Sequence, residues 1–354
     1  MKALRFHGHK DIRLEDVEEP TPRPGWSIVE VGWGTICASD VKEYFGPLYC
    51  SPEPNPLTGV GLPVTLGHEF AGRVVEMETG GPSPTGVQVG DRVAVDGCIK
   101  CGECWYCTHG NYVLCDKLAI LGFDAHGGFA QRVAAPNYAL HRLPDGVPDE
   151  VGALIEPLSV AVHAVRRGRV APGDVVAIVG AGMIGMGVLA AARAAGAGQV
   201  YVVEQLGSRR ERAASRGATA VIDPEAHDPV EQLADLTAGH GADVAFDCAG
   251  KQQSIESAIL LARKGGRIVV VGTFQQPPTI DMNKIVLQER EIYGCLAYVD
   301  DFPRTIALVA DGRIDAEHFI TDRIALRDIV DKGFRELIDD PSPHLRIVVD
   351  AQQV

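Results

Sequence analysis

The two halves of the chain differ in the spacing of their hydrophobic positions. In the first 150 residues, short runs rich in β-branched side chains alternate with turns that contain Gly and Pro. The clearest of these runs lie at 27–31, 71–77, 92–95 and 129–134. Short runs with turn residues between them are typical of an irregular, barrel-like β-sheet. We therefore expect a β-rich domain over residues 1–150.

After residue 150, strand-like apolar runs alternate with helical stretches. The strand-like runs lie at 175–179, 199–204, 220–222, 242–248 and 267–272. Strands that alternate with helices form parallel βαβ units, so the pattern predicts a doubly wound parallel sheet. Beyond about residue 290 the alternation becomes less regular, and the chain closes with the strand-like run LRIVVD.

A glycine pattern follows the run at 175–179 and opens a helical stretch. It reads Gly180-Ala-Gly182-Met183-Ile184-Gly185. In a dinucleotide fold the first glycine permits a tight turn, the second lets the backbone approach the pyrophosphate, and the third lets helix and strand pack closely. The helix N-terminus attracts the phosphates. The pattern therefore predicts a dinucleotide site.

Glu204 ends the next strand-like run and indicates which dinucleotide binds. A carboxylate at this place accepts hydrogen bonds from the ribose hydroxyls and repels a 2′-phosphate, which favours NAD over NADP. Arg209 and Arg210 follow closely and can stack on adenine or meet a phosphate.

Composition narrows the class of protein. The 354 residues are 46% hydrophobic and 23% charged, with a formal net charge of −14 and no basic run, which argues against binding to nucleic acid or to anionic membranes. The N-terminal residues form no apolar signal sequence. The apolar stretch 175–198 contains the glycine cluster, so we interpret it as strand, turn and helix rather than as a membrane span. We expect a cytoplasmic protein.

Five of the nine cysteines gather in one short stretch, which indicates metal binding rather than disulfides. Four thiolates close a tetrahedral zinc site with no open position, so such a zinc is structural. The first candidate set is Cys101, Cys104, Cys107 and Cys115. A competing set at uniform spacing contains Cys98 in place of Cys115, and spacing does not separate the two. An iron–sulfur cluster is disfavoured because the Cys-Pro ending is missing.

Other candidate ligands are scattered along the chain. They are Cys37, His68, Glu69 and Glu156. Each alone is compatible with an ordinary structural role. A cysteine, a histidine and a carboxylate can together bind a zinc ion and leave the open fourth position that a catalytic site needs. The sequence does not show whether these residues meet in space.

Taken in order, these motifs resemble those of the zinc-dependent medium-chain dehydrogenase/reductase family, the alcohol and polyol dehydrogenases. The matching segments are Cys37-Ala-Ser39-Asp40, Gly67-His68-Glu69, Val89-Gly90-Asp91-Arg92-Val93, the four-cysteine stretch, Glu156-Pro157, and Gly180–Gly185 with Glu204. The resemblance implies a GroES-like β-rich catalytic domain from residues 1–150 and 290–354, with a Rossmann NAD-binding domain of residues 151–289 inserted between them. Within the family the chain is most similar to the butanediol dehydrogenases and, more broadly, to the sorbitol-type polyol dehydrogenases.

The resemblance also implies roles for the scattered ligands. Cys37, His68 and Glu156 would hold a catalytic zinc, and Glu69 would lie just behind it and could join the coordination. Asp40 would orient His68. Val160 would pack on the nicotinamide.

A proton relay is implied as well. Ser39 would pass the alcohol proton to the nicotinamide ribose. Lys42 stands where many relatives carry a histidine that completes the relay. A charged lysine accepts no proton, so we expect proton release through water and an electrostatic role for Lys42. A desolvated Lys42 with a lowered pKa, or a Lys42 that only contacts cofactor oxygens, are the alternatives.

The implied reaction is hydride transfer between NAD and a secondary alcohol, with zinc as the Lewis acid. A vicinal diol such as 2,3-butanediol is the first expectation, because its second hydroxyl can reach zinc or Glu69. A sorbitol-type polyol, or a specialised sugar, cyclitol or terpenoid alcohol, is the alternative. A non-catalytic relative is disfavoured because the zinc ligands and Ser39 are all present. The family's fold implies a homodimer or homotetramer.

Overall fold

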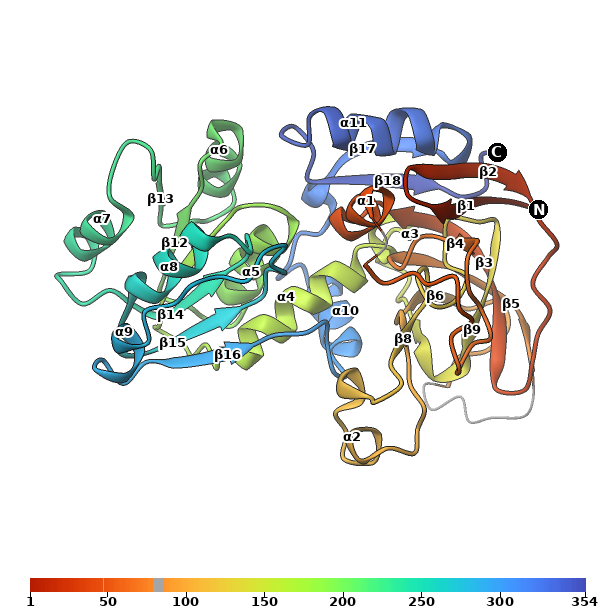
Figure 1. The fold of residues 1–354 in the computed structure, drawn as a ribbon, viewed down its shortest axis with the longest axis horizontal. Coiled ribbons are helices and arrows are strands. Elements are labelled where there is room, and N and C mark those ends of the chain that lie inside the picture. Colours follow the sequence, from red (N-terminus) through yellow and green to blue (C-terminus); the bar gives the residue numbers. More distant parts are fainter. Residues whose placement is uncertain (47, 79–85) are drawn as a thin grey trace. The chain divides into compact units, whose positions relative to one another are not determined.

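The computed structural model describes residues 1–46, 48–78 and 86–354. Its contacts divide the chain into two compact units (Figure 1). Unit 1 consists of Met1–Glu156 and Ala316–Val354, and unit 2 consists of Pro157–Asp315. The chain returns from unit 2 to unit 1 at Ala316, whereas the sequence predicted this return near residue 290. The reason is that β16 (Glu291–Gly294) pairs with the preceding strand and continues the sheet of unit 2.

A seven-stranded sheet forms the body of unit 1. Its strands are β3 (Trp26–Thr35), β5 (Phe70–Met77), β6 (Arg92–Val95), β9 (Arg132–Pro136), β10 (Leu140–Arg142), β17 (Ile320–Ala325) and β18 (Arg346–Asp350). The order is β10-β6-β5-β3-β18-β17, and β9 pairs with β3 beside this path. The last strand of the chain, β18, therefore lies inside the sheet, antiparallel to β3 and parallel to the edge strand β17.

Smaller elements complete unit 1. The strands are β1 (Lys2–Gly8), β2 (Asp11–Asp16), β4 (Val64–Thr65), β7 (Cys98–Ile99) and β8 (Ala119–Ile120). The α-helices are α1 (Ala38–Phe45), α2 (Trp105–Thr108), α3 (Asp149–Gly152) and α11 (Arg335–Asp339). Short turns of other helix types are η1 (Tyr112–Leu114), η2 (Asn137–Ala139), η3 (Glu317–Phe319), η4 (Leu326–Asp328) and η5 (Ile329–Phe334). A second sheet has the order β2-β1-β4, and β7 pairs with β8.

One apolar cluster of unit 1 positions the candidate metal ligands. It contains Ile36, Leu66 and Phe123, all 5% exposed or less. Ile36 directly precedes Cys37, and Leu66 lies two residues before His68. Close packing of these side chains fixes the start of α1 and the turn into β5. The sequence thus places each ligand beside an apolar anchor.

Unit 2 is built on a six-stranded parallel sheet. Its strands are β11 (Val175–Val179), β12 (Gln199–Val203), β13 (Ala220–Ile222), β14 (Ala242–Asp247), β15 (Ala262–Val270) and β16. The order β13-β12-β11-β14-β15-β16 is that of a doubly wound dinucleotide fold. The helices are α5 (Met183–Ala194), α6 (Gly207–Ser215), α7 (Pro229–Leu236), α8 (Gln252–Leu261), α9 (Asn283–Val286) and α10 (Phe302–Ala310), together with most of α4 (Ile155–Arg167).

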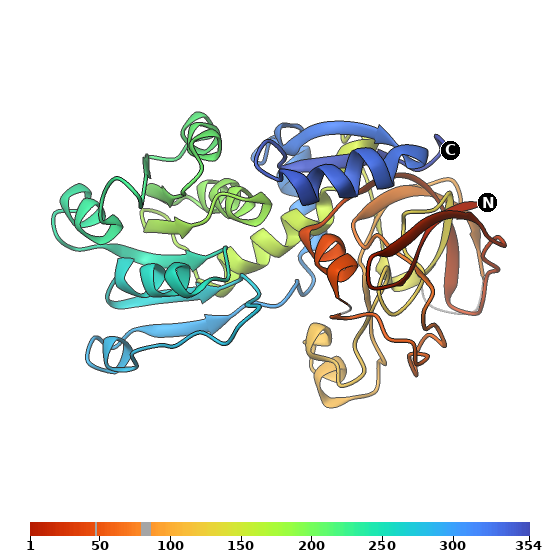
Figure 2. The ribbon, with the colours of Figure 1, turned by 45° about the horizontal axis from the view of Figure 1, so that its top comes forward.

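Helices cover both faces of this sheet (Figures 1 and 2). Alternate residues of β11 point to opposite faces. Ala177 packs in an apolar cluster with Ile255 of α8, whereas Ile178 faces α5, where a Cβ on Gly185 would lie 3.5 Å from it. Because both faces are buried, the strands read as continuous apolar runs. The predicted α/β fold with a doubly wound parallel sheet and a separate β-rich unit is confirmed.

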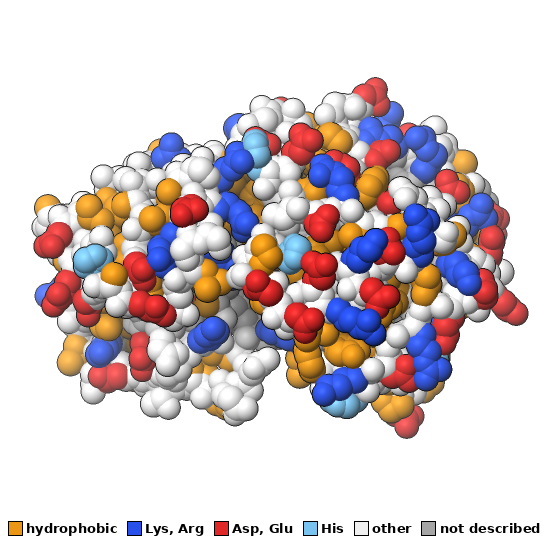
Figure 3. Space-filling view, turned by 90° about the horizontal axis from the view of Figure 1, so that it is seen from above, with side chains coloured by type: hydrophobic (Ala, Val, Ile, Leu, Met, Phe, Trp, Pro, Cys, Tyr) orange, Lys and Arg blue, Asp and Glu red, His pale blue; other side chains and the backbone are white. Residues whose placement is uncertain are grey.

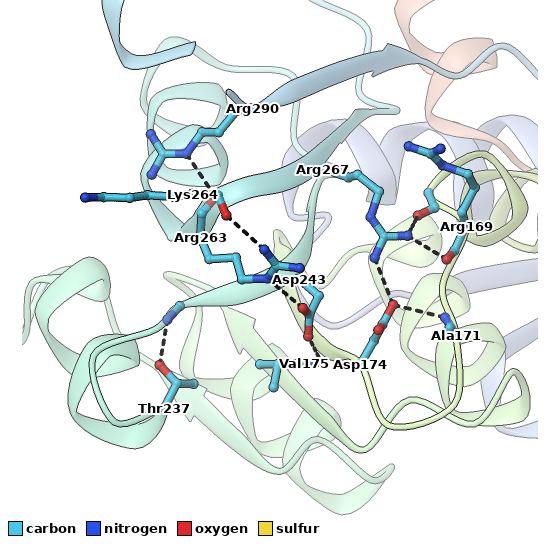
Figure 4. Close-up of polar contacts among 12 residues, drawn as sticks. Arg169, Ala171, Asp174, Val175, Thr237, Asp243, Arg263, Lys264, Arg267 and Arg290 are labelled. Carbon is cyan, nitrogen blue, oxygen red and sulfur yellow. Dashed lines mark hydrogen bonds and ion pairs between the residues drawn. The ribbon is translucent and has the colours of Figure 1, made fainter. Parts of the chain in front are cut away.

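A polar network links the amino ends of the strands in unit 2 (Figure 4). Asp243, at the start of β14, accepts hydrogen bonds from the Val175 N–H at 2.8 Å and from Arg263 Nε at 2.7 Å. Arg267 pairs with Asp174 at 3.0 Å. The protein's own groups therefore occupy this edge, and ligands of such sheets bind at the opposite, carboxyl edge.

No helix of the described residues is long and apolar enough to cross a membrane. The apolar stretch 175–198 instead contains β11, a glycine turn and α5, which confirms the interpretation made from the sequence. On the face drawn in Figure 3, acidic and basic side chains are interspersed with apolar ones.

Candidate metal centres and nucleotide site

Cys37, His68 and Glu69 come together in unit 1. Each offers one ligand atom, and these atoms all lie within 4.8 Å of one another. Cys37 caps the N-terminus of α1, where its backbone N–H donates to Asp40 Oδ2 at 2.9 Å. His68 and Glu69 follow Gly67, whose φ of +95° strongly favours glycine. We call this group the buried centre.

Polar groups face both ring nitrogens of His68. Nδ1 lies 3.4 Å from Oδ1 of the buried Asp40, and Nε2 lies 3.4 Å from Ser39 Oγ. Burial lowers the pKa of His68, but Asp40 and Cys37 outweigh burial and raise that pKa well above its ordinary value. The electrostatic potential around His68 is therefore strongly negative. A carboxylate behind the second nitrogen is the usual partner of a zinc-binding histidine.

A buried arginine offsets part of this negative charge. Arg346, on β18, donates from Nη2 to Glu69 Oε1 at 2.6 Å, and the Thr35 hydroxyl donates to Glu69 Oε2. Burial lowers the pKa of Arg346, but Glu69, Cys37 and Glu156 together raise it above the ordinary value. Both oxygens of Glu69 thus have a donor within the protein.

Glu156 lies beside the buried centre rather than within it. It sits near the start of α4 and is 9% exposed, and its charge reaches Arg346. It is not part of the three-residue group found among the described residues. The structure therefore groups Glu69 with Cys37 and His68, and a place for Glu156 among the zinc ligands stays a prediction.

The residues present fit a zinc ion. The donor set comprises a thiol, an imidazole and a carboxylate, all of which zinc accepts. Three buried carboxylates lie in this region: Asp40 faces His68, whereas Glu69 and Glu156 act on the Arg346 guanidinium. Buried negative charge without a counter-charge is costly, so a divalent cation would complete the balance.

A second group of candidate ligands lies in a lobe of unit 1 that contains α2 (Figure 1). Its members, whose sulfur atoms all lie within 4.8 Å of one another, are Cys101, Cys104, Cys107 and Cys115. Backbone N–H groups point at the sulfurs, for example from Cys104 to Cys101 Sγ at 3.4 Å. The N–H groups of Asp116 and Cys107 lower the pKa of Cys104 to about 6. Burial raises the pKa of Cys107 and of Cys115, so the fit to a four-sulfur zinc site rests on the convergence of the four sulfur atoms.

Cys98 is outside this lobe group. It lies in β7, it is 2% exposed, and its N–H donates to Asp96 Oδ1 at 2.7 Å. Asp96 Oδ2 accepts a hydrogen bond from the Tyr112 hydroxyl at 2.9 Å. Of the two cysteine sets, the structure brings together the one that ends in Cys115. Cys98 lies instead in the β7–β8 pair.

The glycine pattern lies between β11 and α5 in unit 2. Gly180 has a φ of +97°, and a Cβ on Gly185 would overlap the carbonyl oxygen of Gly180. Gly182 caps α5, so the helix N-terminus opens at the turn. The geometry is that of a dinucleotide-binding turn.

Glu204 and Arg209 line a cavity of about 500 Å³ together with Gly180 and Gly182. Glu204 Oε2 accepts the Ala181 N–H at 2.7 Å, and Oε1 accepts the Leu206 N–H at 2.9 Å. The carboxylate is therefore fixed at the end of β12, beside the glycine turn. It stands where a ribose would bind.

Known proteins share this arrangement. Residues 23–145 match the alcohol dehydrogenase GroES-like domain, and residues 184–311 match the zinc-binding dehydrogenase family. The (R,R)-butanediol dehydrogenase of Bacillus subtilis is 38% identical over 348 residues, which cover 97% of both chains. The chain belongs to the zinc-dependent medium-chain dehydrogenase/reductase family.

A solved structure and a second sequence are also similar to this dehydrogenase. The crystal structure of 2R,3R-butanediol dehydrogenase from Bacillus subtilis superposes with a TM-score of 0.91, at 38% identity and 99% coverage of both chains. A sorbitol dehydrogenase of Bacillus subtilis is 33% identical over 342 residues, covering 95% of this chain and 94% of that one. Both likenesses extend over both units.

The other predicted site residues of the dehydrogenase take ordinary positions in their helices. Ser39 and Lys42 lie in α1, one turn apart, Val160 lies in α4, and Met183 and Ile184 begin α5. Lys42 and Val160 are each partly exposed. Their contacts with substrate or cofactor stay predictions.

Sequence reasoning missed Arg346 and Thr35. The arginine interrupts the apolar run at the end of the chain, and it is 5% exposed. A charged residue inside a buried strand requires a partner, and this was the available signal. Thr35 carries no comparable signal, because threonine is common in strands.

Proposed function

We propose that this dehydrogenase oxidises a vicinal diol with NAD, as in the interconversion of 2,3-butanediol and acetoin. The observation that carries the proposal is the convergence of Cys37, His68 and Glu69 within 4.8 Å in an electronegative, buried setting. The 38% identity to a butanediol dehydrogenase supports the substrate class. The 33% identity to a sorbitol dehydrogenase makes a polyol the second candidate.

We further propose that Cys37 and His68 hold the catalytic zinc together with a carboxylate. Glu69 is the carboxylate that forms a three-residue group with them, and Glu156 is the one that the family resemblance assigns. When bound, zinc supplies a Lewis acid that lowers the pKa of an alcohol. Cys101, Cys104, Cys107 and Cys115 would hold a structural zinc.

Ser39 is the residue best placed to remove the alcohol proton. Its hydroxyl lies 3.4 Å from His68 Nε2, the nitrogen that Asp40 does not face. The Ser39 hydroxyl would accept the alcohol proton while its own proton passes to the nicotinamide ribose and on to water. Lys42 adds a positive charge one turn further along α1.

The cofactor preference rests on Glu204. Its carboxylate is 8% exposed and fixed by two backbone N–H groups, so it cannot swing away from a ligand in this cavity. It accepts hydrogen bonds from ribose hydroxyls and would repel a 2′-phosphate. When bound, NAD supplies the hydride acceptor.

We infer a homodimer or homotetramer formed through unit 2. β16 is an edge strand of its sheet, and edges with unpaired backbone groups invite pairing with a second chain. Exposed apolar side chains gather along α9 and β16, and they are Met282, Val286, Leu287, Ile292 and Leu296. Sedimentation of the full chain tests this inference, and a monomer at micromolar concentration would contradict it.

We infer a cytoplasmic location from the cysteines. All nine are free of disulfides, including the four that gather in the lobe. Closely spaced thiols persist in a reducing compartment.

The direct test of the proposed function is NADH formation over a substrate panel. The zinc-loaded protein would be offered the stereoisomers of 2,3-butanediol, then sorbitol, erythritol and 2-butanol. We expect selective turnover of one butanediol isomer, and much weaker activity with NADP. Selective turnover of sorbitol would support the polyol candidate, and no turnover of any substrate would contradict both.

A further inference from the structure

A buried carboxylate binds the backbone of residues 48–50, which lie shortly after α1. Glu43 is 0% exposed. Its oxygens accept hydrogen bonds from the backbone N–H groups of Leu48 at 3.0 Å, of Tyr49 at 3.2 Å and of Cys50 at 2.8 Å. Three successive N–H groups converging on one carboxylate fix the course of the backbone. Hydrogen bonds to Glu43 therefore hold the backbone that carries the Tyr49 side chain.

The ring of Tyr49 is joined to the buried centre through one other ring. It stacks on Phe123 at a centroid distance of 5.0 Å and an angle of 26°. Phe123, itself 5% exposed, lies 4.9 Å from the His68 ring. One aromatic ring, that of Phe123, therefore separates Tyr49 from the candidate zinc ligand His68.

The Tyr49 side chain is also open to a ligand. The residue is 42% exposed, although its neighbour Phe123 is buried. Burial of part of the side chain raises the pKa of Tyr49, and the negative charges of Cys37 and Glu43 raise it further, while His68 acts in the opposite direction. The hydroxyl therefore lies within electrostatic reach of two residues of the buried centre and stays protonated as a hydrogen-bond donor.

Three other side chains near the centre already have partners or roles. Each oxygen of Glu69 accepts a hydrogen bond, one from Arg346 and one from Thr35. Ser39 is assigned to the alcohol that reacts. Tyr44 packs with Phe334 at a centroid distance of 6.4 Å, against the apolar cluster of unit 1. A vicinal diol has a second oxygen on the adjacent carbon, and that oxygen needs a donor.

We propose that the Tyr49 hydroxyl donates a hydrogen bond to the second oxygen of the diol or acyloin, and that Glu43 is the positioning residue that holds Tyr49 there. This inference rests on the proposed function. It assigns the preference for a diol over a simple secondary alcohol to one hydroxyl group. A simple secondary alcohol has no second oxygen to accept the hydrogen bond from Tyr49. The enzyme would therefore select for the diol.

The test is the ratio of kcat/KM for the preferred 2,3-butanediol isomer to kcat/KM for 2-butanol, measured with the zinc-loaded enzyme and NAD. Y49F keeps the ring and removes the hydroxyl. We expect the ratio to fall by about three- to tenfold, the value of one neutral hydrogen bond, with most of the change in KM for the diol. Y106F removes a phenol hydroxyl in the lobe and should leave the ratio within about twofold.

E43Q tests the positioning role. It keeps the shape of the side chain but weakens the three backbone hydrogen bonds, so we expect a smaller fall in the same ratio, and zinc content equal to wild type. Y49F/E43Q should show no larger fall than Y49F alone, because both changes act through one hydroxyl. Additive effects of the two substitutions would overturn the positioning role.

The outcomes separate the inference from the function on which it rests. If the wild-type enzyme prefers the diol and Y49F retains that preference within twofold, the assignment of Tyr49 is wrong and the proposed function stands. If the wild-type enzyme turns over no diol, the proposed function is wrong, and the assignment falls with it.

Discussion

The two candidate metal centres of this dehydrogenase are built in opposite ways. The lobe group lies between Cys101 and Cys115, a single short stretch of chain. The buried centre draws on segments far apart in the sequence. The carbonyl of Ile36, next to Cys37, accepts a hydrogen bond from Arg346, 310 residues away. The first centre is therefore local, and the second requires that unit 1 be folded.

This difference teaches what each centre depends on. Few apolar side chains support the lobe, where Trp105 is 61% exposed and Leu114 is 48% exposed. A metal ion supplies the stability that a core cannot supply in so small a piece. The buried centre is surrounded by apolar packing and by an ion pair, so its metal is needed for chemistry and less for folding. Three changes test this division, and a fourth compares two histidines of unit 1.

The largest effect is expected for C37A. This change removes a ligand of the buried centre, and without the ion the alcohol is not activated. We expect kcat/KM to fall on the order of 1,000-fold or more, with Tm within a few degrees of wild type, because Cys37 is only partly buried. C295A, another partly buried cysteine, serves as the control and should keep activity. A fall in Tm that parallels the loss of activity would contradict the division.

The converse is expected for C107S in the lobe. The change leaves the buried centre intact but opens the four-sulfur site. Tm should fall by about 10 °C, zinc content should drop from two ions to one per chain, and kcat at low temperature should stay within a few-fold. Thermal unfolding, metal analysis and steady-state kinetics check these values. Loss of kcat with an unchanged Tm would reverse the assignment of the two centres.

R346M tests whether the ion pair between Arg346 and Glu69 stabilises the buried centre. Methionine keeps much of the volume but leaves Glu69 without its 2.6 Å partner. Breaking a buried pair by removing one member costs about 3 kcal/mol, which urea unfolding measures. E69Q/R346M should recover part of the loss, because it also removes the uncompensated charge. If R346M is as stable as wild type, the ion pair does not support the fold.

The smallest effect concerns pH, and it compares two histidines of unit 1, the buried His68 and the solvent-exposed His126. His68 faces Asp40, whereas His126 contacts Arg5 at 3.2 Å and accepts a hydrogen bond from the Thr65 N–H at 3.3 Å. Burial, and then Arg5, lower the pKa of His126 to about 4. The unfolded state therefore binds more protons between pH 6.5 and 4, and stability falls as the pH falls through this window.

H126Q should flatten this dependence. Between pH 6.5 and pH 5 the wild-type protein should lose stability through His126, but solvent screening at this exposed side chain limits the loss to about 1 kcal/mol or less. H126Q should lose less by that amount in paired urea titrations. H240Q, at an exposed position, is the matched control and should behave as wild type. An identical slope for H126Q and wild type would contradict the role of His126.

The sequence predicts local features of the molecule better than distant ones. The glycine turn and the cysteine lobe follow from spacing, because their members are neighbours in the chain. Spacing did not choose between Cys98 and Cys115, since that choice depends on β7 pairing with β8. It also did not reveal that β16 joins the sheet of unit 2, so that the chain returns to unit 1 only at Ala316.

The buried centre could be named from the sequence only through family resemblance. Cys37, His68 and Glu69 have no mutual spacing that requires a common site, and Arg346 comes from the last strand. The same limit applies to Tyr49, whose position depends on a carboxylate that gives no signal in the sequence. Long-range packing decides these positions, and the hydrophobic pattern records only which residues are buried.

The most direct test of the account is anomalous diffraction at the zinc edge from crystals of the full chain. The account predicts two sites per chain. One is bound by Cys101, Cys104, Cys107 and Cys115, and the other by Cys37 and His68 with Glu69 or Glu156 as the carboxylate. No zinc at Cys37 and His68 in an enzyme that oxidises the diol would contradict the central claim that this buried centre carries the chemistry.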